Sequence, residues 1–355
     1  MKIISKVKEY TVELVQGSLR PDAPWQAMQR GGRRFYFVDR KFHELYAPQL
    51  KSVIGNDFCL LIDATEPNKS YLKLADYYTA LINAGFTRND WLVTFGGGIV
   101  QDISGFIAST LFRGLKWVFF PTTLLAQADS CIGSKTSINF GDAKNLIGTF
   151  YPPDVIIIDP DFIKTLSDAD FNSGVGEIVK FHLLADDARY QALRQFLASP
   201  LLRQSLHLNA IIASTLQVKR EYFEEDEFDT GRRNLLNYGH CFGHALESAS
   251  NFAVAHGEAV LVGMGFANML ALHRGLISKE LYTEIEALLR LRYPRFNLKE
   301  ISIDALIGYM KKDKKRVSSL DLTMILATGI GTAAKYDDIR EEEVRDVFKE
   351  FVQNF

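Results

Sequence analysis

The chain has few cysteines, and the three that it contains are far apart in the sequence. An odd number of scattered cysteines argues against a disulfide framework and is typical of a reducing compartment. They are Cys59, Cys131 and Cys241. The chain also lacks an apolar run of the roughly 20 residues that a membrane-spanning helix needs, and its N-terminal segment lacks the apolar core of a signal peptide. We therefore expect a cytoplasmic protein with no membrane partner.

An excess of charge of either sign is absent as well. The 41 Lys and Arg side chains face 43 Asp and Glu side chains, which leaves a net charge of −2. Such a chain has no general attraction for nucleic acid, so we expect no nucleic-acid partner. An anionic small molecule must instead meet a local cluster of cations. With 355 residues, the chain is long enough for two domains and a large core.

Short apolar runs alternate with helical patterns in residues 1–158, which predicts an α/β domain built on a parallel sheet. The predicted strands lie within 33–39, 57–63, 90–100, 115–123 and 151–160, and the predicted helices within 69–86 and 101–112. Long helical patterns dominate residues 159–355, so we expect a second, mostly α-helical domain there.

Three glycines in "FGGGIVQD" stand where a predicted strand ends and a helix begins. Glycine lets backbone N–H groups approach a phosphate, and a helix N-terminus favours negative charge. Two other strand ends carry compatible groups, namely Thr122 and Thr123 in "FPTT" and Glu66 and Lys69 in "IDATEPNKS". A tight structural turn is the alternative for the glycines alone, but the three strand ends together favour a dinucleotide site.

Three of the seven histidines are crowded into one short stretch, at His240, His244 and His256. His240 and His244 are four residues apart, and Arg233 and Asn237 continue that spacing backwards. If this segment is one helix, the polar stripe occupies the face on which a core helix carries apolar residues. Surface or hydrogen-bonded histidines are the alternative. A divalent metal explains the pattern better, because zinc and cobalt take imidazole ligands.

A carboxylate for the same metal is available in "GVGEIVKF", where Glu177 and Lys180 share one predicted helix face. Such pairs are usually solvated on a surface, but this stretch is otherwise uncharged. The segment 128–148 is rich in lysine, asparagine and glycine and predicts a phosphate-binding loop, with an exposed polar loop as the alternative. Lys219 adds a further cation, while the run at 311–315 is typical of a solvated face.

The motifs "GGGIVQD", "FRG", "PTTLLAQADS", "KNLIGTFYPP", "GEIVKF", "LLNYGHCFGH", "HGEAV" and "DKK" follow one another in the order found in a known family. On these residues the chain resembles the 3-dehydroquinate synthases and the wider sugar phosphate cyclases, from about residue 36 to about residue 330. The resemblance implies a Rossmann-like NAD-binding domain over 1–158, a helical metal- and substrate-binding domain over 159–355, an active site between them and a homodimer.

The resemblance also implies roles for individual residues. The metal ligands of one zinc or cobalt ion would be Glu177, His240 and His256. The NAD-binding residues would be Asp39, Glu66, Lys69, Gly97, Gly98, Asp102, Thr122, Thr123, Lys144 and Thr165. The residues that bind and convert a phosphorylated sugar acid would be Asp129, Lys135, Asn145, Lys180, Lys219, Arg233, Asn237, His244 and Lys314, joined by Arg113 from the other subunit.

Several positions depart from the usual pattern of 3-dehydroquinate synthases. Ser134 stands where the family usually has glycine, and "NFGDAKN" replaces an Asn-His-Pro segment. Asp229 replaces a glutamate, and Lys41 replaces an asparagine. These changes keep open a related cyclase of the 2-epi-5-epi-valiolone synthase type. Retention of Arg233 and its neighbours favours 3-dehydroquinate synthase, because that set meets a substrate carboxylate.

Two other classes are alternatives. A dehydrogenase related to glycerol dehydrogenase has the same architecture, but it would consume NAD and has no need of so many lysines. A non-catalytic NAD-binding regulator has no reason to keep metal ligands and lysines together. The lysines that argue against both are Lys135, Lys144, Lys180 and Lys219.

Overall fold

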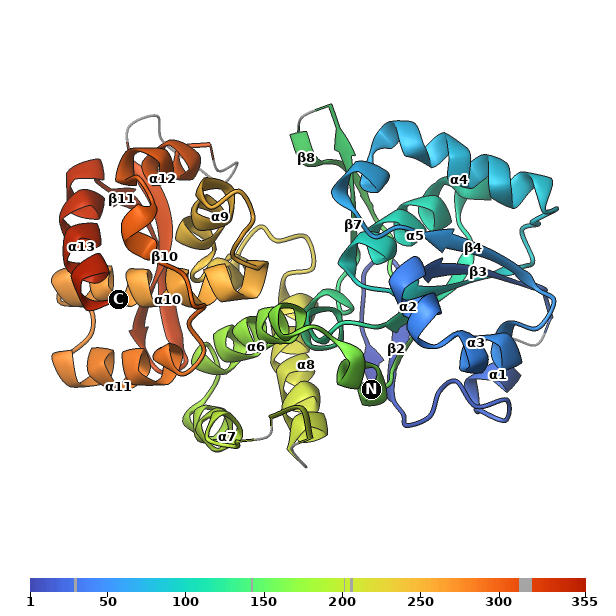
Figure 1. Ribbon diagram of the computed structural model, residues 1–355, viewed down its shortest axis with the longest axis horizontal. Helices are drawn as coiled ribbons and strands as arrows, with labels where there is room; N and C mark the ends of the chain where they lie inside the picture. Colours follow the sequence, from blue (N-terminus) through green and yellow to red (C-terminus); the bar gives the residue numbers. More distant parts are fainter. Residues whose placement is uncertain (29–30, 142, 201, 205–206, 313–320) are drawn as a thin grey trace. The chain divides into compact units, whose positions relative to one another are not determined.

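The chain folds into two compact units, Met1–Leu166 and Ser167–Phe355, in a computed structural model (Figure 1). The division falls after Leu166, whereas the sequence placed it after Ile158. The short helix η4, Pro160–Thr165, lies in between and belongs to the first unit, because Asp159 accepts a hydrogen bond from the backbone N–H of Ser18 at 2.7 Å. The residues described are 1–28, 31–141, 143–200, 202–204, 207–312 and 321–355.

A seven-stranded sheet in the order β1-β2-β9-β6-β5-β3-β4 forms the first unit, and every pairing in it is parallel except that of β1 with β2. Its strands are β1 Lys2–Ile3, β2 Tyr10–Leu14, β3 Arg34–Asp39, β4 Phe58–Ile62, β5 Trp91–Gly96, β6 Lys116–Pro121 and β9 Val155–Ile158. The chain adds β4 on one side of β3 and then β5 on the other side. This reversal makes the carboxyl ends of β3 and β5 the switch point where a parallel sheet binds ligands.

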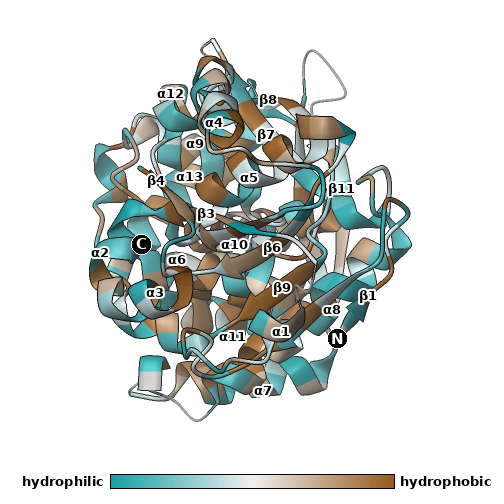
Figure 2. Cartoon of the chain, turned by 90° about the vertical axis from the view of Figure 1, so that its right-hand side faces the viewer, coloured by the Kyte–Doolittle hydropathy of each residue, from teal (hydrophilic) through white to brown (hydrophobic). Residues whose placement is uncertain are grey.

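Helices and short turns connect these strands. They are α1 Trp25–Met28, α2 Arg40–Leu45, α3 Ala47–Ile54, η1 Glu66–Lys69, α4 Tyr71–Asn83, α5 Gly98–Thr110, η2 Leu111–Arg113 and η3 Ala126–Ser130. The strands run apolar because both faces of the sheet are covered, and β9, which reads Val-Ile-Ile-Ile, is hydrophobic along its length (Figure 2). Phe95 and Phe120 stack at 4.2 Å between ring centroids in the core beneath α2 and α3.

Two features of this unit differ from the expectation. The edge strands β1 and β2 were not predicted. The lysine-rich segment is not a loop but an antiparallel hairpin, β7 Lys135–Phe140 and β8 Ala143–Phe150, which turns at Gly141. Its polar residues hid the strand pattern, because Ser137 and Asn139 bond to the carboxylates of Asp102 and Glu66 rather than packing in an apolar core. The predicted strands and helices over 33–123 are confirmed.

The second unit is mostly helical, as expected, with one two-stranded sheet. Its helices are α6 Asp168–Leu183, α7 Asp187–Leu197, η5 Leu202–Gln204, α8 Leu208–Glu225, η6 Arg232–Asn237, α9 His240–Ala249, α10 His256–His273, α11 Lys279–Arg290, η7 Leu298–Glu300, α12 Ile303–Met310 and α13 Glu341–Asn354. The strands β10 Leu322–Gly329 and β11 Thr332–Ile339 pair antiparallel. Helix α10 is apolar on all faces and buried, and α6, α9, α11, α13 and β10 pack around it.

Helices α6 and α10 cross with their backbones in contact. A Cβ added to Gly176 would lie 2.0 Å from the carbonyl oxygen of Gly257, and one added to Gly257 would lie 1.8 Å from that of Ser173. The two helices approach this closely only because both positions are glycine. As a result Glu177 on α6 and His256 on α10 become direct neighbours.

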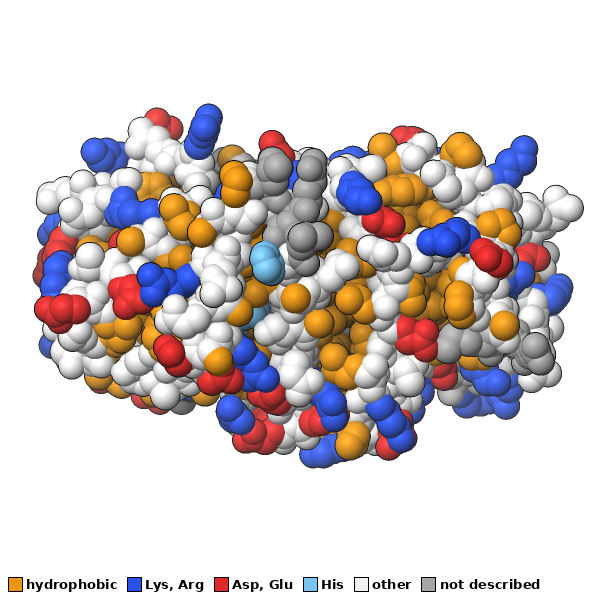
Figure 3. All heavy atoms as spheres, turned by 90° about the horizontal axis from the view of Figure 1, so that it is seen from below, with side chains coloured by type: hydrophobic (Ala, Val, Ile, Leu, Met, Phe, Trp, Pro, Cys, Tyr) orange, Lys and Arg blue, Asp and Glu red, His pale blue; other side chains and the backbone are white. Residues whose placement is uncertain are grey.

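Among the described residues, no helix combines the length and the apolar character needed to cross a bilayer. Acidic and basic side chains are interspersed on the face drawn in Figure 3. This agrees with the near-zero net charge.

Candidate active site

Glycines open the switch point of the first unit at the start of α5. Gly97 precedes the helix and makes no side-chain cap, so the first N–H groups of α5 keep no partner from that residue. A Cβ on Gly97 would meet the Thr123 methyl group at 3.0 Å, whereas a Cβ on Gly98 would meet nothing within 4 Å. The helix start therefore faces an open space lined by Thr123, which fits a phosphate.

Asp39 ends β3 and Thr122 directly follows β6, two strands that lie on either side of β5 in the sheet. The Asp39 carboxylate accepts hydrogen bonds from the backbone N–H groups of Lys41 and Phe42 at 2.8 and 3.2 Å and so caps α2. The backbone N–H of Thr122 donates to the carbonyl of Gly96 at 3.0 Å. These bonds hold both predicted nucleotide residues at the carboxyl ends of their strands.

A polar cluster joins η1, α5 and the β7–β8 hairpin. The buried Lys69 ammonium donates to Asp102 at 3.0 Å and to the side-chain oxygen of Asn145 at 2.8 Å. Ser137 donates to Asp102 through its hydroxyl at 2.8 Å and through its backbone N–H at 3.0 Å. Burial raises the pKa of Asp102, and the Lys69 ammonium and the Ser137 hydroxyl oppose that rise. Asn145, which the resemblance assigned to the substrate, thus lies among residues that it assigned to NAD.

Asn139 extends this cluster to Glu66. Its amide donates to the Glu66 carboxylate at 2.7 Å, and its side-chain oxygen accepts the backbone N–H of Asn145 at 2.9 Å. That bond supports the positive φ of 55° at Asn145. The resemblance gave no role to Ser137 or Asn139, and only the pairing of β7 with β8 reveals their contacts.

The other predicted residues of the first unit are distributed over η3, the β7–β8 hairpin, η4 and η2. Asp129 lies in η3, and Lys135 and Lys144 are exposed on the hairpin. Thr165 is 3.2 Å from the hydroxyl of Tyr46. Arg113 is exposed on the tight turn η2, with a positive φ of 64°.

Three predicted metal ligands converge in the second unit. Nε2 of His256 lies 3.2 Å and Nε2 of His240 lies 3.6 Å from the same oxygen of Glu177. The Glu177 side chain is 1% exposed, and Lys180 forms an ion pair with its other oxygen. Neither carboxylate oxygen accepts a hydrogen bond of good geometry. A buried carboxylate without hydrogen bonds, faced by two imidazole nitrogens, has the donor set that a zinc or cobalt ion takes.

The charges of this cluster are strongly coupled. Burial alone would raise the pKa of Glu177, but the Lys180 ammonium and the two imidazoles outweigh it and hold the pKa well below its ordinary range. Burial, aided by Lys180, lowers the pKa of His240 well below its ordinary value. Burial also tends to lower the pKa of His256, but the carboxylates of Glu177 and Glu247 have the larger effect and raise this pKa to about 10. The carboxylate therefore stays ionised and ready to bind a cation.

The polar stripe through the histidines is not on one helix, so that part of the expectation is wrong. Arg233 and Asn237 lie in the 3₁₀ helix η6, and Gly239, with a φ of 78°, separates it from α9, which starts at His240. His244 is one turn further along α9 and is exposed, and the ring nitrogens of His240, His244 and His256 lie within 4.8 Å of one another. The histidines are nevertheless grouped, since α9 packs on α10.

Cations border this centre. Lys180 and Lys219 are buried, and their ammonium nitrogens lie 4.7 and 5.9 Å from the ring centroid of Phe181. Arg233 is also buried, and its guanidinium donates to the carbonyl of Glu227. The sequence did not reveal Asp226, whose carboxylate accepts the backbone N–H groups that hold the Arg233 loop. These come from Thr230 at 2.9 Å, Gly231 at 2.7 Å and Arg233 at 3.0 Å.

A small cavity of about 50 Å³ opens beside the histidines. Asn237, His240 and His244 line it together with Lys335 of β11, a cation that the sequence did not point to. Lys335 could have been found only from the pairing of β10 with β11. Lys314, a predicted substrate residue, lies outside the described residues.

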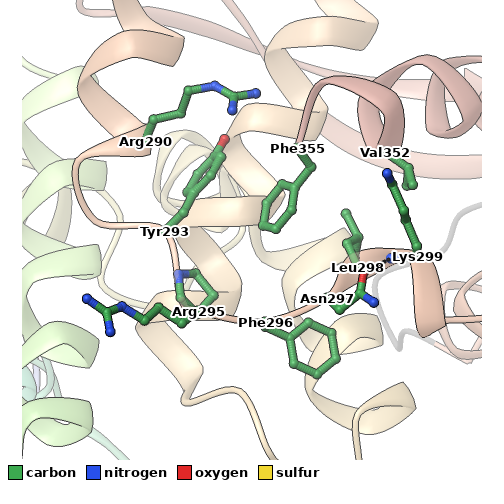
Figure 4. Close-up of a pocket in the computed structure, with 10 residues that line it drawn as sticks. Arg290, Tyr293, Arg295, Phe296, Asn297, Leu298, Lys299, Val352 and Phe355 are labelled. Carbon is green, nitrogen blue, oxygen red and sulfur yellow. Dashed lines mark hydrogen bonds between the residues drawn. The ribbon is translucent and has the colours of Figure 1, made fainter.

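A larger cavity of about 370 Å³ lies between the end of α11 and α13 (Figure 4). Tyr293 and Phe355 stack in it at 5.1 Å between ring centroids, and the Arg295 side chain points away from them. None of the residues predicted for metal, NAD or substrate lines it.

Comparison with known proteins places the chain among named relatives. The family model "3-dehydroquinate synthase N-terminal" matches residues 59–173, and "3-dehydroquinate synthase C-terminal" matches residues 174–316. The 3-dehydroquinate synthase of Dichelobacter nodosus is 32% identical over 344 residues, which cover 96% of this chain and 93% of that protein. The one of Dictyoglomus turgidum is 36% identical over 309 residues, or 86% of each chain.

A solved structure has the same fold along the entire chain. The 2-epi-5-epi-valiolone synthase of Streptomyces hygroscopicus, with NAD+ and Zn2+ bound, is 28% identical, and the alignment covers 99% of each chain with a TM-score of 0.86.

Proposed function

Because the chain belongs to the 3-dehydroquinate synthase family, we propose that it is an NAD- and divalent-metal-dependent lyase that converts 3-deoxy-arabino-heptulosonate 7-phosphate to 3-dehydroquinate and phosphate. The observation that carries this proposal is the buried Glu177 carboxylate, which lacks hydrogen bonds and faces His240 and His256. A structural ion pair would not need two imidazoles beside it. The three residues are assigned as ligands of one zinc or cobalt ion.

The nucleotide is assigned to the switch point of the first unit. The open space at Gly98 and the uncapped N-terminus of α5 suit a pyrophosphate, and Asp39 and Glu66 at neighbouring strand ends suit ribose hydroxyls. When bound, NAD would supply a reversible hydride acceptor, and the metal would supply a Lewis acid for a substrate oxygen. Because this hydride acceptor would be regenerated within each turnover, NAD would not be consumed.

The chain's own residues have separate tasks in this scheme. Lys180 balances Glu177 and keeps the carboxylate ionised. Lys219 and Arg233 are assigned to the anionic groups of the substrate, because their charges are held in buried positions. Arg233 presents a planar fork that matches a carboxylate, and the Asp226 loop holds its backbone in place. A neutral sugar would leave this arginine poorly paired, which costs binding free energy.

The protein is also proposed to be a homodimer, with Arg113 directed to the substrate phosphate of the neighbouring subunit. The exposed position of Arg113 on a turn with positive φ supports this assignment. Light scattering on the purified protein tests the oligomeric state. Mixing Arg113→Ala subunits with subunits inactivated at Glu177 should restore part of the turnover, since each hybrid dimer would contain one complete site. The cytoplasmic location stays a prediction.

The deciding experiment supplies the protein with NAD and zinc or cobalt and offers three substrates in parallel. These are the heptulosonate phosphate, sedoheptulose 7-phosphate and glucose 6-phosphate. We expect phosphate release and a carbocyclic product from the first. Faster conversion of sedoheptulose 7-phosphate would favour the valiolone-type activity instead. NADH that accumulates in proportion to product would mark a dehydrogenase.

Arg233→Ala tests the substrate assignment within the chain. It should lower kcat/KM for the heptulosonate phosphate by roughly 10- to 100-fold, as expected for the loss of a charged hydrogen bond. Arg232→Ala, which removes the neighbouring, partly exposed arginine paired with Glu225, serves as the control. Equal losses in both variants would contradict a specific role for Arg233.

A further inference from the structure

Glu247 is a carboxylate at the metal centre to which nothing above assigns a role. It follows His240 by seven residues on α9, which is close to two turns, so both side chains lie on the same face of the helix. One oxygen of Glu247 lies 3.0 Å from Nδ1 of His256. The opposite nitrogen of that ring, Nε2, lies 3.2 Å from Glu177. The imidazole of His256 is thus held between two carboxylates.

This arrangement decides which nitrogen of His256 can bind a metal. A carboxylate only accepts hydrogen bonds, so with a cation held at Nε2 beside Glu177, Nδ1 of His256 would keep the hydrogen that Glu247 accepts. Nε2 is then aimed at Glu177. His240 has the same orientation by other means, because its Nδ1 lies 3.2 Å from the backbone carbonyl of Tyr238. Both imidazoles therefore have Nδ1 anchored and Nε2 directed at one carboxylate.

The position of Glu247 is itself fixed. Its side chain is 16% exposed, and its backbone carbonyl accepts the N–H of Phe252 at 2.8 Å and the hydroxyl of Ser250 at 3.1 Å. These bonds hold the C-terminal end of α9. A carboxylate whose backbone is fixed loses little conformational freedom when it bonds to an imidazole. It therefore orients the ring better than a carboxylate on a mobile segment would.

We propose that Glu247 is a positioning residue that orients His256 and strengthens its bond to the divalent metal. The inference rests on the proposed function, since it requires that Glu177, His240 and His256 bind a metal. Carboxylates behind histidine ligands fix the ring and make it a better donor, and their loss typically weakens metal binding about 10- to 100-fold.

Another pair on the same helix provides a matched control. His273, the last residue of α10, contacts Glu350 of α13 at 2.8 Å, and both side chains are exposed. Glu350→Gln breaks a contact of the same chemical type on the same helix, at the end opposite to His256. A role of Glu247 that is merely to join two helices would make its loss resemble that of Glu350.

The experiment measures zinc and cobalt affinity of the metal-free full chain by competition with a chelator. Glu247→Gln, which retains an acceptor without the charge, should weaken binding by about 10-fold, and Glu247→Ala by up to about 100-fold. Glu350→Gln should change it less than threefold. The visible absorption of the cobalt-loaded Glu247 variants should shift as well, because the geometry or donor strength of His256 changes.

The outcomes separate the two proposals. A wild-type chain that binds neither metal refutes the proposed function. Wild-type binding that both Glu247 variants match within threefold overturns this inference alone, and so does weaker binding with an unchanged cobalt spectrum. Circular dichroism of the metal-free proteins establishes that each variant is folded. If Glu247→Ala does not fold, the affinity and the spectrum of Glu247→Gln decide.

Discussion

The buried polar cluster around Asp102 in the first unit and the one around Glu177 in the second unit differ in how their charges are bonded. In the first, Lys69 and Ser137 each donate to both Asp102 and Asn145 through hydrogen bonds of 2.8 to 3.0 Å. In the second, Glu177 lacks hydrogen bonds and is surrounded by Lys180 and imidazoles. The first cluster is stable without a ligand, whereas the second concentrates charge that a cation can use.

This contrast suggests a division of labour. A nucleotide is held by many weak contacts. Side chains that already bond to one another can replace some of those hydrogen bonds by bonds to the nucleotide at little cost in free energy. A metal needs ionised, poorly solvated donors, and these are costly to bury unless charges balance them. The following predictions test whether the contrast is real, in order of decreasing effect.

The largest effect is expected from Glu177→Ala. It leaves the Lys180 ammonium buried without its counter-charge, so the free energy of unfolding should fall by about 3–5 kcal/mol. Metal binding and turnover should also be lost. The exposed pair Asp346 and Lys349 has the same spacing, and Asp346→Ala should cost less than about 1 kcal/mol. Denaturant unfolding of the three proteins measures both values. Equal losses in the free energy of unfolding would mean that the buried pair stabilises the fold no more than the exposed pair does.

The next effect concerns pH and His182, a buried imidazole of α6 that takes no part in the proposed chemistry. Its Nδ1 lies 2.8 Å from the carbonyl of Ile178 and its Nε2 3.1 Å from the hydroxyl of Ser214. Burial lowers its pKa from 6.5 to about 4. The unfolded chain takes up this proton near pH 6.5 and the folded chain only near pH 4. Stability is thus complete above pH 6.5 and falls by about 3 kcal/mol as the pH decreases through this window.

His182→Gln should remove this part of the pH dependence, which denaturant unfolding between pH 4 and 7 would reveal. His273→Gln removes an exposed imidazole of the same unit and serves as the control. A wild-type slope that survives in His182→Gln would contradict the assignment.

A smaller effect is expected in the first unit. Asn139→Ala removes a bond to the Glu66 carboxylate and one from the backbone of Asn145. We expect a loss of about 2 kcal/mol in the free energy of unfolding, since one of these bonds involves a charge. Asn68→Ala removes exposed bonds nearby and should cost less. A cost for Asn139 no greater than that for Asn68 would show that the cluster does not stabilise the unit.

The smallest effect is expected from Gly98→Ala. The added Cβ meets no protein atom within 4 Å, so the fold should not change, but it would crowd a phosphate at the start of α5. NAD should bind about 10-fold more weakly, equivalent to about 1.4 kcal/mol. Titration calorimetry measures this, and Gly308→Ala, equally free of contacts, is the control. Unchanged NAD affinity would exclude Gly98 from the nucleotide site.

Most of the fold could be predicted from the sequence, because apolar runs and helical periodicity determine it locally. The strands at 34–39, 58–62 and 91–96 each consist mostly of apolar residues. The hairpin β7–β8 could not be predicted, since its residues face Asp102 and Glu66 instead of an apolar core. The edge strand β1 has only two residues, which is too short for a pattern.

The site was predictable only in part. The crowding of three histidines and the carboxylate of Glu177 in an otherwise uncharged stretch indicated a metal site, and the resemblance selected Glu177, His240 and His256 as its ligands. The contact that unites them depends on the crossing of α6 and α10, which no local pattern encodes. The contact of Asn139 with Glu66 could not be predicted either, since the two residues lie 73 positions apart in the chain.

The glycines at the crossing of α6 and α10 limit how the gene can change. Any other residue at position 176 or 257 would bring a Cβ within 2.0 Å of a backbone oxygen. In a saturation library selected for turnover, only glycine codons should persist at these two positions, although neither glycine is itself assigned to the metal, NAD or the substrate. A lineage that loses either glycine must separate the helices and, with them, Glu177 from His256. A mutation at either codon should therefore abolish the proposed metal site although Glu177, His240 and His256 are all unchanged.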